Sequence, residues 1–522
     1  MGPVRGEEPS RPLVELIRFA HDILIAAVAL LPMGAGANPP YTGPMLPPRT
    51  LVPLIVACAL FMENLDSTVL STSLPAIATD LNSDPIHLKL ALTSYLLSLA
   101  VFIPASGWMA DRFGARLVFR LAICVFLLGS VLSGLSQSIE HIVIARVVQG
   151  MGGAMMVPVG RLVVLRSVPK NEMVGSLAWL TMPALIGPVL GPPLGGFITT
   201  YFHWRWIFWI NIPIGALGLL LATLYIPNFK GEQAAKFDSV GFILSGIGLA
   251  SVVTGATAIG LDVLPLTGTL AILTCGVAAL IGYVIHARRT RQPILDLRLL
   301  RIPTFRASVI GGSLFRIGIG AQPFLLPLLF QIGFGLTAFQ SGMLTFVAAV
   351  GAFTMKASAA PILRLLGFRR VLLFNAVLSA CFVVMPGWFT PDTPHAAILA
   401  ILLLGGFFRS LQFTSINALG YSDVDQRRMS RATSFISVAQ QVALSVGVSI
   451  GALTLEAAMR ARGGTELLAT DFRWAFAAVG AVSALSFVSF LRLRPDAGAE
   501  VSGHRSKKLV APDPVSNMQD RA

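Results

Sequence analysis

Apolar runs long enough to cross a lipid bilayer recur along almost the whole chain, from Leu51 to Leu491, with short polar gaps between them. A hydrocarbon core about 30 Å thick takes about 20 apolar residues per helix. Only α-helices and closed β-barrels satisfy every backbone polar group in lipid, and the alternating segments of about ten residues typical of barrel strands are absent from the sequence. The sequence therefore predicts an all-α membrane protein.

Charged and turn-forming residues divide the apolar runs into about fourteen predicted spans. With 55% hydrophobic and 12% charged residues, the chain is more apolar than a soluble globular domain, and lipid accounts for the excess. The predicted spans lie near 51–74, 90–110, 117–137, 141–165, 175–200, 204–226, 238–260, 266–286, 305–331, 339–360, 371–390, 396–420, 431–456 and 474–492.

Lys and Arg give the chain a net charge of +14 and are concentrated in every second connection between the predicted spans. Because cytoplasmic loops carry the basic excess, this alternation places both termini in the cytoplasm and requires an even number of spans. The placement of the basic residues in alternate loops accounts for the positive net charge by membrane orientation. We therefore do not expect nucleic acid as a partner. The other connections hold only a few basic residues, namely Lys89, Arg205, Arg460, Arg462 and Arg473.

A short internal repeat, which we call the sequence echo, indicates two related halves. Residues 111–116 and 364–369 both place Gly and Arg two residues apart after an apolar helix. Spans 1 to 6 and 9 to 14 would then form two six-helix bundles, separated by an inserted helix pair. The predicted boundaries are 1–48 for an extension that is disordered or precedes a true start at Met45, 49–228 for the first bundle, 229–300 for the inserted pair and a cytoplasmic loop, 301–494 for the second bundle, and 495–522 for a disordered cytoplasmic tail.

The first predicted span contains two carboxyl groups, Glu63 and Asp66, three residues apart on one helical face. Burial in lipid and mutual repulsion favour protonation of such groups, which suits a proton carrier. Arg146 in the fourth span needs a partner or a water-filled cavity, and Asp66 is the natural candidate. Two alternatives stay open: Glu63 could be solvated near the membrane boundary, and an Asp66–Arg146 pair could be a static buried salt bridge.

The connection after the second span combines glycines with charges in the motif formed by Gly107, Asp111, Arg112, Gly114 and Arg116. Glycines allow a tight turn and close approach, and the charges can pair across the cytoplasmic face. Such a motif could latch one conformation, whereas the simpler reading is an ordinary basic cytoplasmic loop.

The fifth span carries glycines at successive i+4 positions, which form one smooth ridge for a neighbouring helix. Its prolines bend the helix and free backbone carbonyls, as a moving interface requires, although static packing by small residues is the alternative. The residues of this motif are Gly187, Pro188, Gly191, Pro192, Gly195 and Gly196.

Further polar residues within spans are candidates for lining a substrate cavity: Arg316, Arg409 and Gln149. The two arginines, with Arg146, would give the cavity a positive lining and favour an anionic substrate, or they could bind backbone carbonyls between packed helices. Lys356 near the end of the tenth span could extend its amine to the membrane surface.

Enzyme and metal signals are absent from the sequence. The G-x-S-x-G match at 447–451 lies within an apolar helix rather than at a strand-to-helix turn, and no phosphate-binding G-x-x-x-x-G-K-[ST] motif occurs. All four cysteines fall in apolar segments, and the seven histidines form no metal-binding spacing. We therefore expect no catalytic residues, no bound metal and no cofactor.

Together these motifs resemble the major facilitator superfamily, specifically its drug:proton antiporter branch with fourteen spans, the EmrB/QacA type. The resemblance covers roughly residues 50–495, and its motifs lie at 65–75, 107–116, 146–153, 187–196 and 204–213. Within the branch, 104–108 and 153–161 are most similar to the MdtD-type multidrug resistance proteins.

The resemblance implies alternating access by two helical bundles, with the proton gradient driving export of small amphipathic compounds across a bacterial inner membrane. Asp66 and Arg146 inherit the proton-coupling role, whereas Glu63 is outside the usual signature. An organic anion such as citrate or iron-citrate is an alternative substrate, and a transport-inactive membrane sensor or scaffold is an alternative of another class. A periplasmic adaptor protein is an open partner that no sequence feature indicates.

Overall fold

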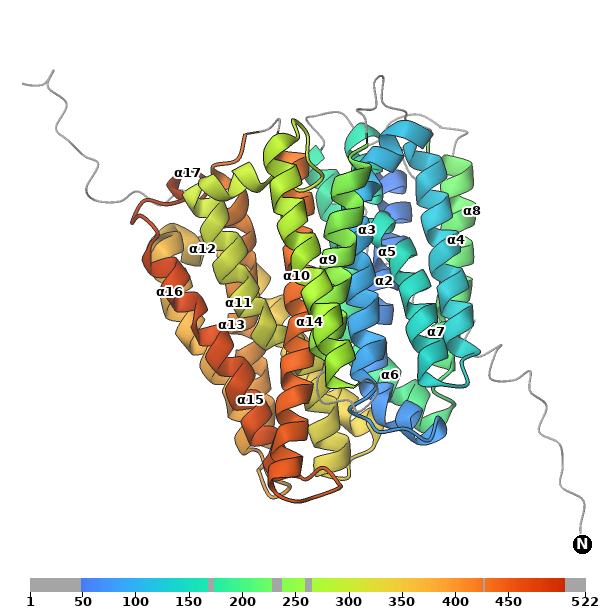
Figure 1. Ribbon diagram of the computed structural model, residues 1–522, viewed down its shortest axis with the longest axis vertical. Helices are drawn as coiled ribbons and strands as arrows, with labels where there is room; N and C mark the ends of the chain where they lie inside the picture. Colours follow the sequence, from blue (N-terminus) through green and yellow to red (C-terminus); the bar gives the residue numbers. More distant parts are fainter. Residues whose placement is uncertain (1–47, 168–172, 228–236, 259–264, 426–427, 503–522) are drawn as a thin grey trace, which may run out of the picture.

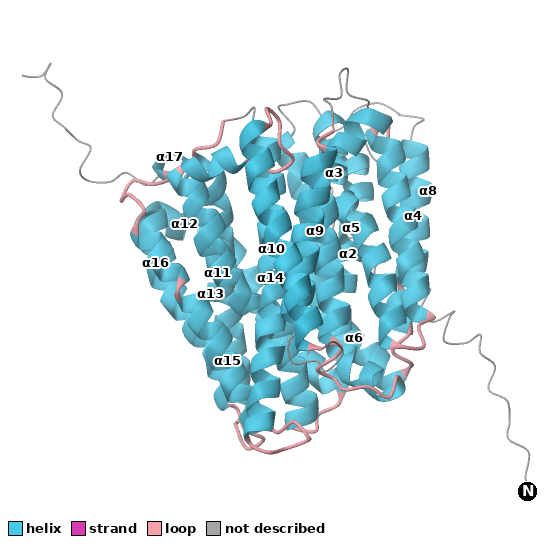
Figure 2. Cartoon of the chain, in the orientation of Figure 1, coloured by secondary structure: helices cyan, strands magenta, loops and turns pink. Residues whose placement is uncertain are grey.

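The computed structural model describes residues 48–167, 173–227, 237–258, 265–425 and 428–502, and over these ranges the chain is helical, with no strand (Figure 2). The predicted N-terminal extension lies outside them, apart from Pro48. The first half comprises α2 (Pro48–Asp80), α3 (Lys89–Phe113), α4 (Ala115–Gly134), α5 (Ile139–Ser167), α6 (Met173–Tyr201), α7 (Trp206–Trp209) and α8 (Asn211–Tyr225). The pair predicted to be inserted between the halves corresponds to α9 (Ser239–Ala258) and α10 (Leu266–Arg289). The second half comprises η2 (Leu297–Arg301), α11 (Pro303–Leu328), η3 (Leu329–Gly333), α12 (Ala338–Val384), η4 (Met385–Trp388), α13 (His395–Ser422), α14 (Met429–Ala461), α15 (Ala469–Ala484), α16 (Ser486–Leu491) and α17 (Ala499–Ser502).

Thirteen helical segments in the described part of the chain are long and apolar enough to cross a membrane. In addition, α6 is a helix of 29 residues at the place of the fifth predicted span. Helices therefore cover every predicted span, and the prediction of an all-α membrane protein is confirmed. Hydroxyl groups within α2 bond to carbonyls of the preceding turn, as Thr68 Oγ1 does to Asn64 O at 2.9 Å, so these polar groups need no water inside lipid.

The two segments of the sequence echo have the same backbone feature. Gly114, between α3 and α4, has φ 98° and ψ 134°, and Gly367, within α12, has φ 74° and ψ 161°. Positive φ of this kind favours glycine because it has no Cβ. Each glycine therefore allows a sharp break between two long helices, and at Gly367 the break separates the tenth and eleventh predicted spans.

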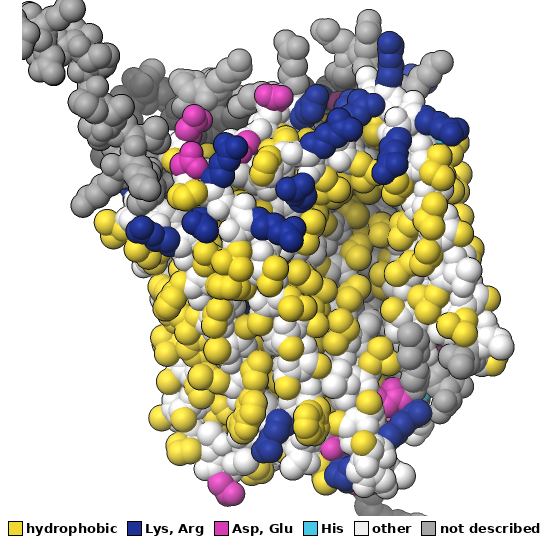
Figure 3. Space-filling view, turned by 60° about the vertical axis from the view of Figure 1, so that its left-hand side comes forward, with side chains coloured by type: hydrophobic (Ala, Val, Ile, Leu, Met, Phe, Trp, Pro, Cys, Tyr) yellow, Lys and Arg dark blue, Asp and Glu magenta, His cyan; other side chains and the backbone are white. Residues whose placement is uncertain are grey.

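Side chains of Lys and Arg gather at one end of the molecule, above a broad hydrophobic band (Figure 3). Figure 1 shows the connection between α3 and α4 at this upper end and the connection between α2 and α3 at the lower end. We call them the basic end and the opposite end.

One hydrophobic core joins both halves at the opposite end, where Leu74 and Ile77 of α2 share it with Phe324 of α11 and Leu455 of α14. Hydrogen bonds reinforce this contact, since Gln331 Nε2 donates to Thr72 O at 2.9 Å. Toward the basic end the cores are mostly separate, one within the first half and another within the second. The molecule is therefore sealed between its halves at the opposite end.

The inserted helix α9 contacts both halves, because it packs against α3 of the first and α14 of the second. Thr257 Oγ1 of α9 lies 2.8 Å from Ser449 Oγ of α14, and Phe242 of α9 packs against Phe102 of α3 with ring centroids 6.0 Å apart. Helix α9 therefore covers the seam between α3 and α14.

The tail predicted to be disordered from Pro495 begins with ordered residues. The short helix α17 contacts α12 and α13, and Gly498 lies against the Phe368 side chain. Residues 495–502, at the start of the predicted tail, are therefore packed against the second half in the structure.

Candidate functional site

Asp66 and Arg146 form an ion pair in the interior of the first half. Asp66 Oδ2 lies 2.5 Å from Arg146 Nη1, and each side chain is only 1% exposed. The two residues come from α2 and α5. Because isolated charges are costly there, each group is held by the other.

Three neutral side chains complete the surroundings of the Asp66 carboxylate. Its Oδ1 accepts hydrogen bonds from Gln149 Nε2 at 2.8 Å and from Asn211 Nδ2 at 2.9 Å. Asn211 Nδ2 also lies 2.9 Å from Ser130 Oγ, and the Ser130 hydroxyl in turn donates to Phe208 O at 2.9 Å. The network therefore ties together four helices: α2, α4, α5 and α8.

Arg146 makes further contacts that fix its guanidinium. Its Nη1 donates to Gln149 Oε1 at 2.8 Å, and Nε lies 3.4 Å from Ala91 O. The guanidinium carbon lies 4.2 Å from the centre of the Tyr95 ring, which is a cation–π contact. These contacts use the planar, multiply donating shape of arginine, which lysine does not have.

Glu63 contacts the hydroxyl group of the same tyrosine. It is 9% exposed, and the Tyr95 hydroxyl lies 3.5 Å from its Oε1. The alternative of a solvated Glu63 at the membrane boundary therefore does not match the structure. Glu63, Tyr95, Arg146 and Asp66 form a continuous row of contacts from one carboxyl to the other.

The motif between α3 and α4 lies at the basic end. Asp111 Oδ1 accepts a hydrogen bond from Arg166 Nη2 of α5 at 2.9 Å, and the Arg116 guanidinium donates to Thr223 O of α8. Arg112 is exposed, and a Cβ at Gly107 would meet nothing within 4 Å. The charges of this motif therefore bridge α3 to α5 and α4 to α8.

The glycine ridge of α6 packs against α2. A Cβ on Gly187 would lie 3.0 Å from Phe61 O, one on Gly195 would lie 2.5 Å from Val69 O, and one on Gly191 would collide with Thr68 Oγ1. All three glycines are buried, whereas Pro188 and Pro192 are half-buried. Only glycine permits backbones to approach this closely.

Gly196 faces a different neighbour, α12 of the second half. A Cβ on Gly196 would collide with Ala338 O, and a Cβ on Gly342 of α12 would collide with Pro192 O. The motif therefore contacts both α2 and the opposing bundle, which places it at an interface between the halves.

Two predicted cavity residues, Arg316 of α11 and Arg409 of α13, each form a hydrogen bond to the other helix. Arg316 is 1% exposed and donates from Nη2 to Asn417 Oδ1 at 2.6 Å. Arg409 Nη1 donates to Gln322 Oε1 at 3.0 Å. Lys356 of α12 donates from Nζ to Thr414 Oγ1 of α13 at 3.0 Å. Gln149, the third predicted cavity residue, belongs instead to the Asp66 network described above.

Sequence reasoning missed three members of the Asp66 network: Tyr95, Ser130 and Asn211. Each is fully or almost fully buried within a predicted span. A buried polar side chain in a membrane helix must find a polar partner, so the presence of these residues within predicted spans was a signal that they take part in a hydrogen-bond network. The sequence could not show which partner, since Asn211 lies 145 positions from Asp66.

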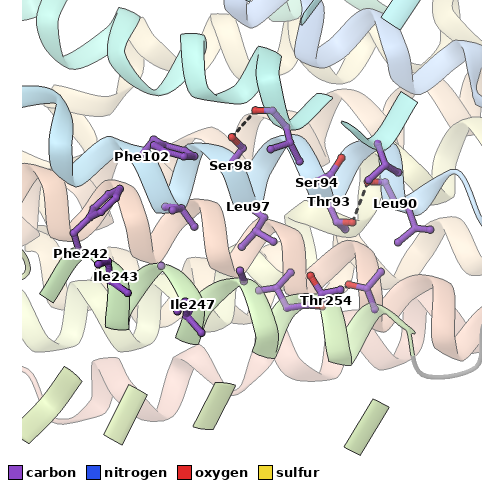
Figure 4. A pocket seen from close by; sticks show the side chains of 17 residues that line it. Leu90, Thr93, Ser94, Leu97, Ser98, Phe102, Phe242, Ile243, Ile247 and Thr254 are labelled. Atoms are coloured by element: carbon purple, nitrogen blue, oxygen red, sulfur yellow. Dashed lines mark hydrogen bonds between the residues drawn. The ribbon is translucent and has the colours of Figure 1, made fainter. Parts of the chain in front are cut away.

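A separate apolar groove of about 530 Å³ lies between α3, α5 and α9 (Figure 4). Leu97 and Ile247 contribute to its walls, and its hydroxyl groups bond to nearby backbone, as Ser98 Oγ does to Val147 O at 2.7 Å. None of the predicted site residues lines it.

Comparison with known proteins agrees with this architecture. The family model of the Major Facilitator Superfamily matches residues 56–448 and 309–518. The chain is 36% identical to "Putative multidrug resistance protein MdtD" of Salmonella heidelberg (strain SL476), over 87% of this chain and 97% of that protein. It is also 36% identical to the protein of the same name from Pectobacterium atrosepticum, over 85% of this chain and 95% of that protein.

Solved structures share the fold at low sequence identity. A D-xylose-proton symporter superposes with a TM-score of 0.62 at 14% identity, over 86% of this chain and 98% of that chain. The human organic anion transporter MFSD10 superposes with a TM-score of 0.56 at 15% identity, over 85% and 100% of the two chains. The family match and the long alignments with curated relatives show that this chain belongs to the Major Facilitator Superfamily.

Proposed function

We propose that this protein is a proton-coupled efflux transporter of small amphipathic compounds that works by alternating access. Its family membership and its relatives named as multidrug resistance proteins support a transport function. The basic loops at one end support a place in a bacterial inner membrane with both termini in the cytoplasm. The seal at the opposite end then faces the periplasm.

The Asp66–Arg146 pair is the observation that carries the proton coupling. When Asp66 takes up a proton, its charge is lost and Arg146 keeps a buried positive charge without a counter-charge. The network then favours a different arrangement of its four helices, in which the guanidinium finds water or another acceptor. Release of the proton restores the pair, so proton movement and helix movement are linked.

The energy source in this proposal is the proton gradient, without a cofactor. The residues that hold and release the proton belong to the chain itself. Tyr95 contacts both Arg146 and Glu63, so it connects the Asp66–Arg146 pair to a second carboxyl group, that of Glu63. The glycine ridge of α6 supplies the smooth surface on which α2 and α12 can shift.

The direct test is transport by purified protein in liposomes under an imposed pH gradient. Dye-like amphipathic cations and neutral amphiphiles should move against their gradient only when the proton gradient is present. Protein-free liposomes and a proton ionophore are the controls. Export at the same rate with and without the proton gradient would overturn the proposed proton coupling. If no compound is transported, the alternative of a transport-inactive sensor or scaffold is favoured.

A second candidate, export of an organic anion, is favoured by the cations of the second half. Arg316, Arg409 and Lys356 lie within membrane spans, and their polar partners given above are neutral. The acidic residues described in that half lie near helix ends or in connections, namely Asp392, Asp423, Asp425, Glu456, Glu466, Asp471, Asp496 and Glu500. Arg316 is buried and Arg409 is half-buried, whereas Lys356 is exposed. A buried cation without a counter-charge is costly, and an anionic substrate would offset that cost at the two arginines.

Competition separates the two candidates in the same liposomes. A di- or tricarboxylate such as citrate should inhibit export of the amphipathic compounds, and should itself move under the pH gradient, if the cations bind substrate. An amphipathic monovalent cation that moves while citrate neither moves nor competes would leave only the first candidate.

A further inference from the structure

A groove on the outer surface of the second half runs along α12 beside α16 (Figure 1) and has a volume of about 560 Å³. Its α12 wall extends from Arg370 through Phe374 and Val377 to Cys381, and this spacing of three or four residues keeps the four side chains on one face of the helix. Phe487 of α16 forms the other wall. Phe374 is 71% exposed within a membrane span, so the groove faces lipid, and its lining is apolar apart from Arg370.

The groove extends from the basic end to the middle of the membrane. Phe368, just before Arg370, lies against Gly498, and α17 begins at the next residue and lies at the basic end (Figure 1). From Arg370 to Cys381 a helix rises by about 16 Å, which is half of a hydrocarbon core of about 30 Å. The groove therefore has the depth of one lipid leaflet, and its arginine lies at the level of the lipid head groups.

Arginines gather at the basic end of the groove. Arg370 is exposed there, and its neighbour Arg369 donates from Nη2 to the carbonyl oxygen of Leu491, the last residue of α16, at 3.4 Å. Arg492 and Arg494, both exposed, follow the end of α16. Within the described ranges, no ion pair joins Arg370, Arg492 or Arg494 to an acid. Figure 3, in which this side of the molecule comes forward, shows dark blue side chains at the upper edge of the yellow band.

The charge balance of this corner is positive. Segments 361–385 and 485–502, which form the two walls and their ends, hold five arginines and two acids, Asp496 and Glu500. By contrast, the groove between α3, α5 and α9 has no charged residue in its walls. The groove beside α16 therefore combines an apolar wall inside the membrane with positive charge at the membrane surface. A ligand that matches both parts has an anionic head and an apolar chain.

We infer that this groove binds an anionic phospholipid, with its phosphate against Arg370 and an acyl chain along α12 from Phe374 to Cys381. Arginine suits this role because its planar guanidinium donates two hydrogen bonds to one phosphate group. Basic pockets between membrane helices recognise anionic lipid head groups in the same way. A lipid held here contacts α12 and α16 together and stabilises their packing beside the break at Gly367. The inference does not depend on which compound is exported.

The measurement is lipid binding to the full chain in detergent, followed by native mass spectrometry. Phosphatidylglycerol and phosphatidylcholine with identical acyl chains are compared, and glycerol phosphate tests the head group without a chain. The first phosphatidylglycerol should bind at least about tenfold more tightly than the first phosphatidylcholine, because only its net negative charge is attracted by the arginines. Glycerol phosphate should bind at least about tenfold more weakly than phosphatidylglycerol, because it buries no apolar surface in the groove.

Variants test the head group and the chain separately. Arg370→Gln should remove most of the preference for phosphatidylglycerol, whereas Arg370→Lys keeps the charge and should keep much of the preference. Arg289→Gln, which neutralises an exposed arginine at the end of α10, is the matched control and should keep all of it. Val377→Trp fills the groove and should weaken binding of the first phosphatidylglycerol by at least about tenfold. Leu220→Trp adds the same side chain on an exposed face of α8 and should leave this binding unchanged.

Equal binding of the two lipids by the wild-type protein would overturn the site. Equal losses in Arg370→Gln and Arg289→Gln would also overturn it, because they would indicate a general effect of the basic end. Glycerol phosphate that binds as tightly as the lipid would identify a soluble anion as the ligand, and unchanged binding in Val377→Trp would place the lipid elsewhere.

Circular dichroism checks that each variant is folded. If Arg370→Gln fails to fold, the comparison of Val377→Trp with Leu220→Trp still decides whether the groove holds the lipid. The binding measurement is independent of transport. A protein that binds phosphatidylglycerol as expected but moves no compound would support the lipid site and overturn the proposed efflux function.

Discussion

The Asp66 carboxylate and the Arg146 guanidinium lie 2.5 Å apart at a point where neither has appreciable contact with solvent. Their pairing is supported from both sides, by Gln149 and Asn211 on the carboxylate and by Tyr95 on the guanidinium. A pair held this firmly resists separation until the carboxyl changes its charge. Protonation is therefore the event that would release it.

Asp66→Asn should abolish proton-driven export while the helical fold is kept. The amide retains an oxygen that accepts hydrogen bonds from Gln149 and Asn211, but it cannot be ionised. Flux under a pH gradient in liposomes and helix content by circular dichroism are the two measurements. Asp392→Asn, in an exposed connection, is the control and should export normally. Full proton-driven export by Asp66→Asn would exclude Asp66 as the carrier.

Arg146→Lys should destabilise the protein by about 2 kcal/mol even though the charge is kept, since hydrogen bonds to charged groups contribute about 1.5 to 3 kcal/mol. A lysine cannot reach Asp66, Gln149 and Ala91 O at once, and it stacks less well on Tyr95. Thermal unfolding in detergent measures the loss, and Arg473→Lys at an exposed position should show little change. Equal unfolding temperatures for both variants would contradict this account.

The same substitution at two buried glycines should have opposite effects. A Cβ on Gly191 of α6 would collide with Thr68, whereas on Gly218 of α8 the nearest atom would be 4.0 Å away. Gly191→Ala should therefore lower the unfolding temperature and slow export. Gly218→Ala should be neutral or stabilising by up to about 1 kcal/mol, because alanine is the better helix former. A tolerated Gly191→Ala would show that α2 and α6 do not need their close contact.

Arg409→Gln should weaken export of an anion by about tenfold if the second half binds negative charge, since losing a charge-assisted hydrogen bond costs about 1.5 kcal/mol or more. Arg409→Lys keeps the charge and should retain most of the activity. Initial export rates of citrate and of an amphipathic cation, measured in parallel, give the comparison. Equal losses for both compounds in Arg409→Gln would show that Arg409 supports the fold rather than substrate choice.

Much of the architecture follows from local features of the sequence. The length of the apolar runs predicts the spans, since a helix must cross a hydrocarbon layer of set thickness, and the alternation of basic loops predicts their direction. The echo around Gly114 and Gly367 predicts two related halves, and both glycines have positive φ at a break between long helices. The packing of residues 495–502 against α12 and α13 has no local pattern in the sequence, because the segment is short and polar.

The sequence by itself determined which residues cross the membrane and which charged side chains are forced into its interior, because both follow from the cost of exposing polar groups to lipid. Only the tertiary structure decided the partners of those side chains. Asp66 meets Arg146 and Asn211 because of how helices distant in the chain pack and rotate against one another. Packing depends on complementary surfaces across many residues, and no single segment of sequence contains that information.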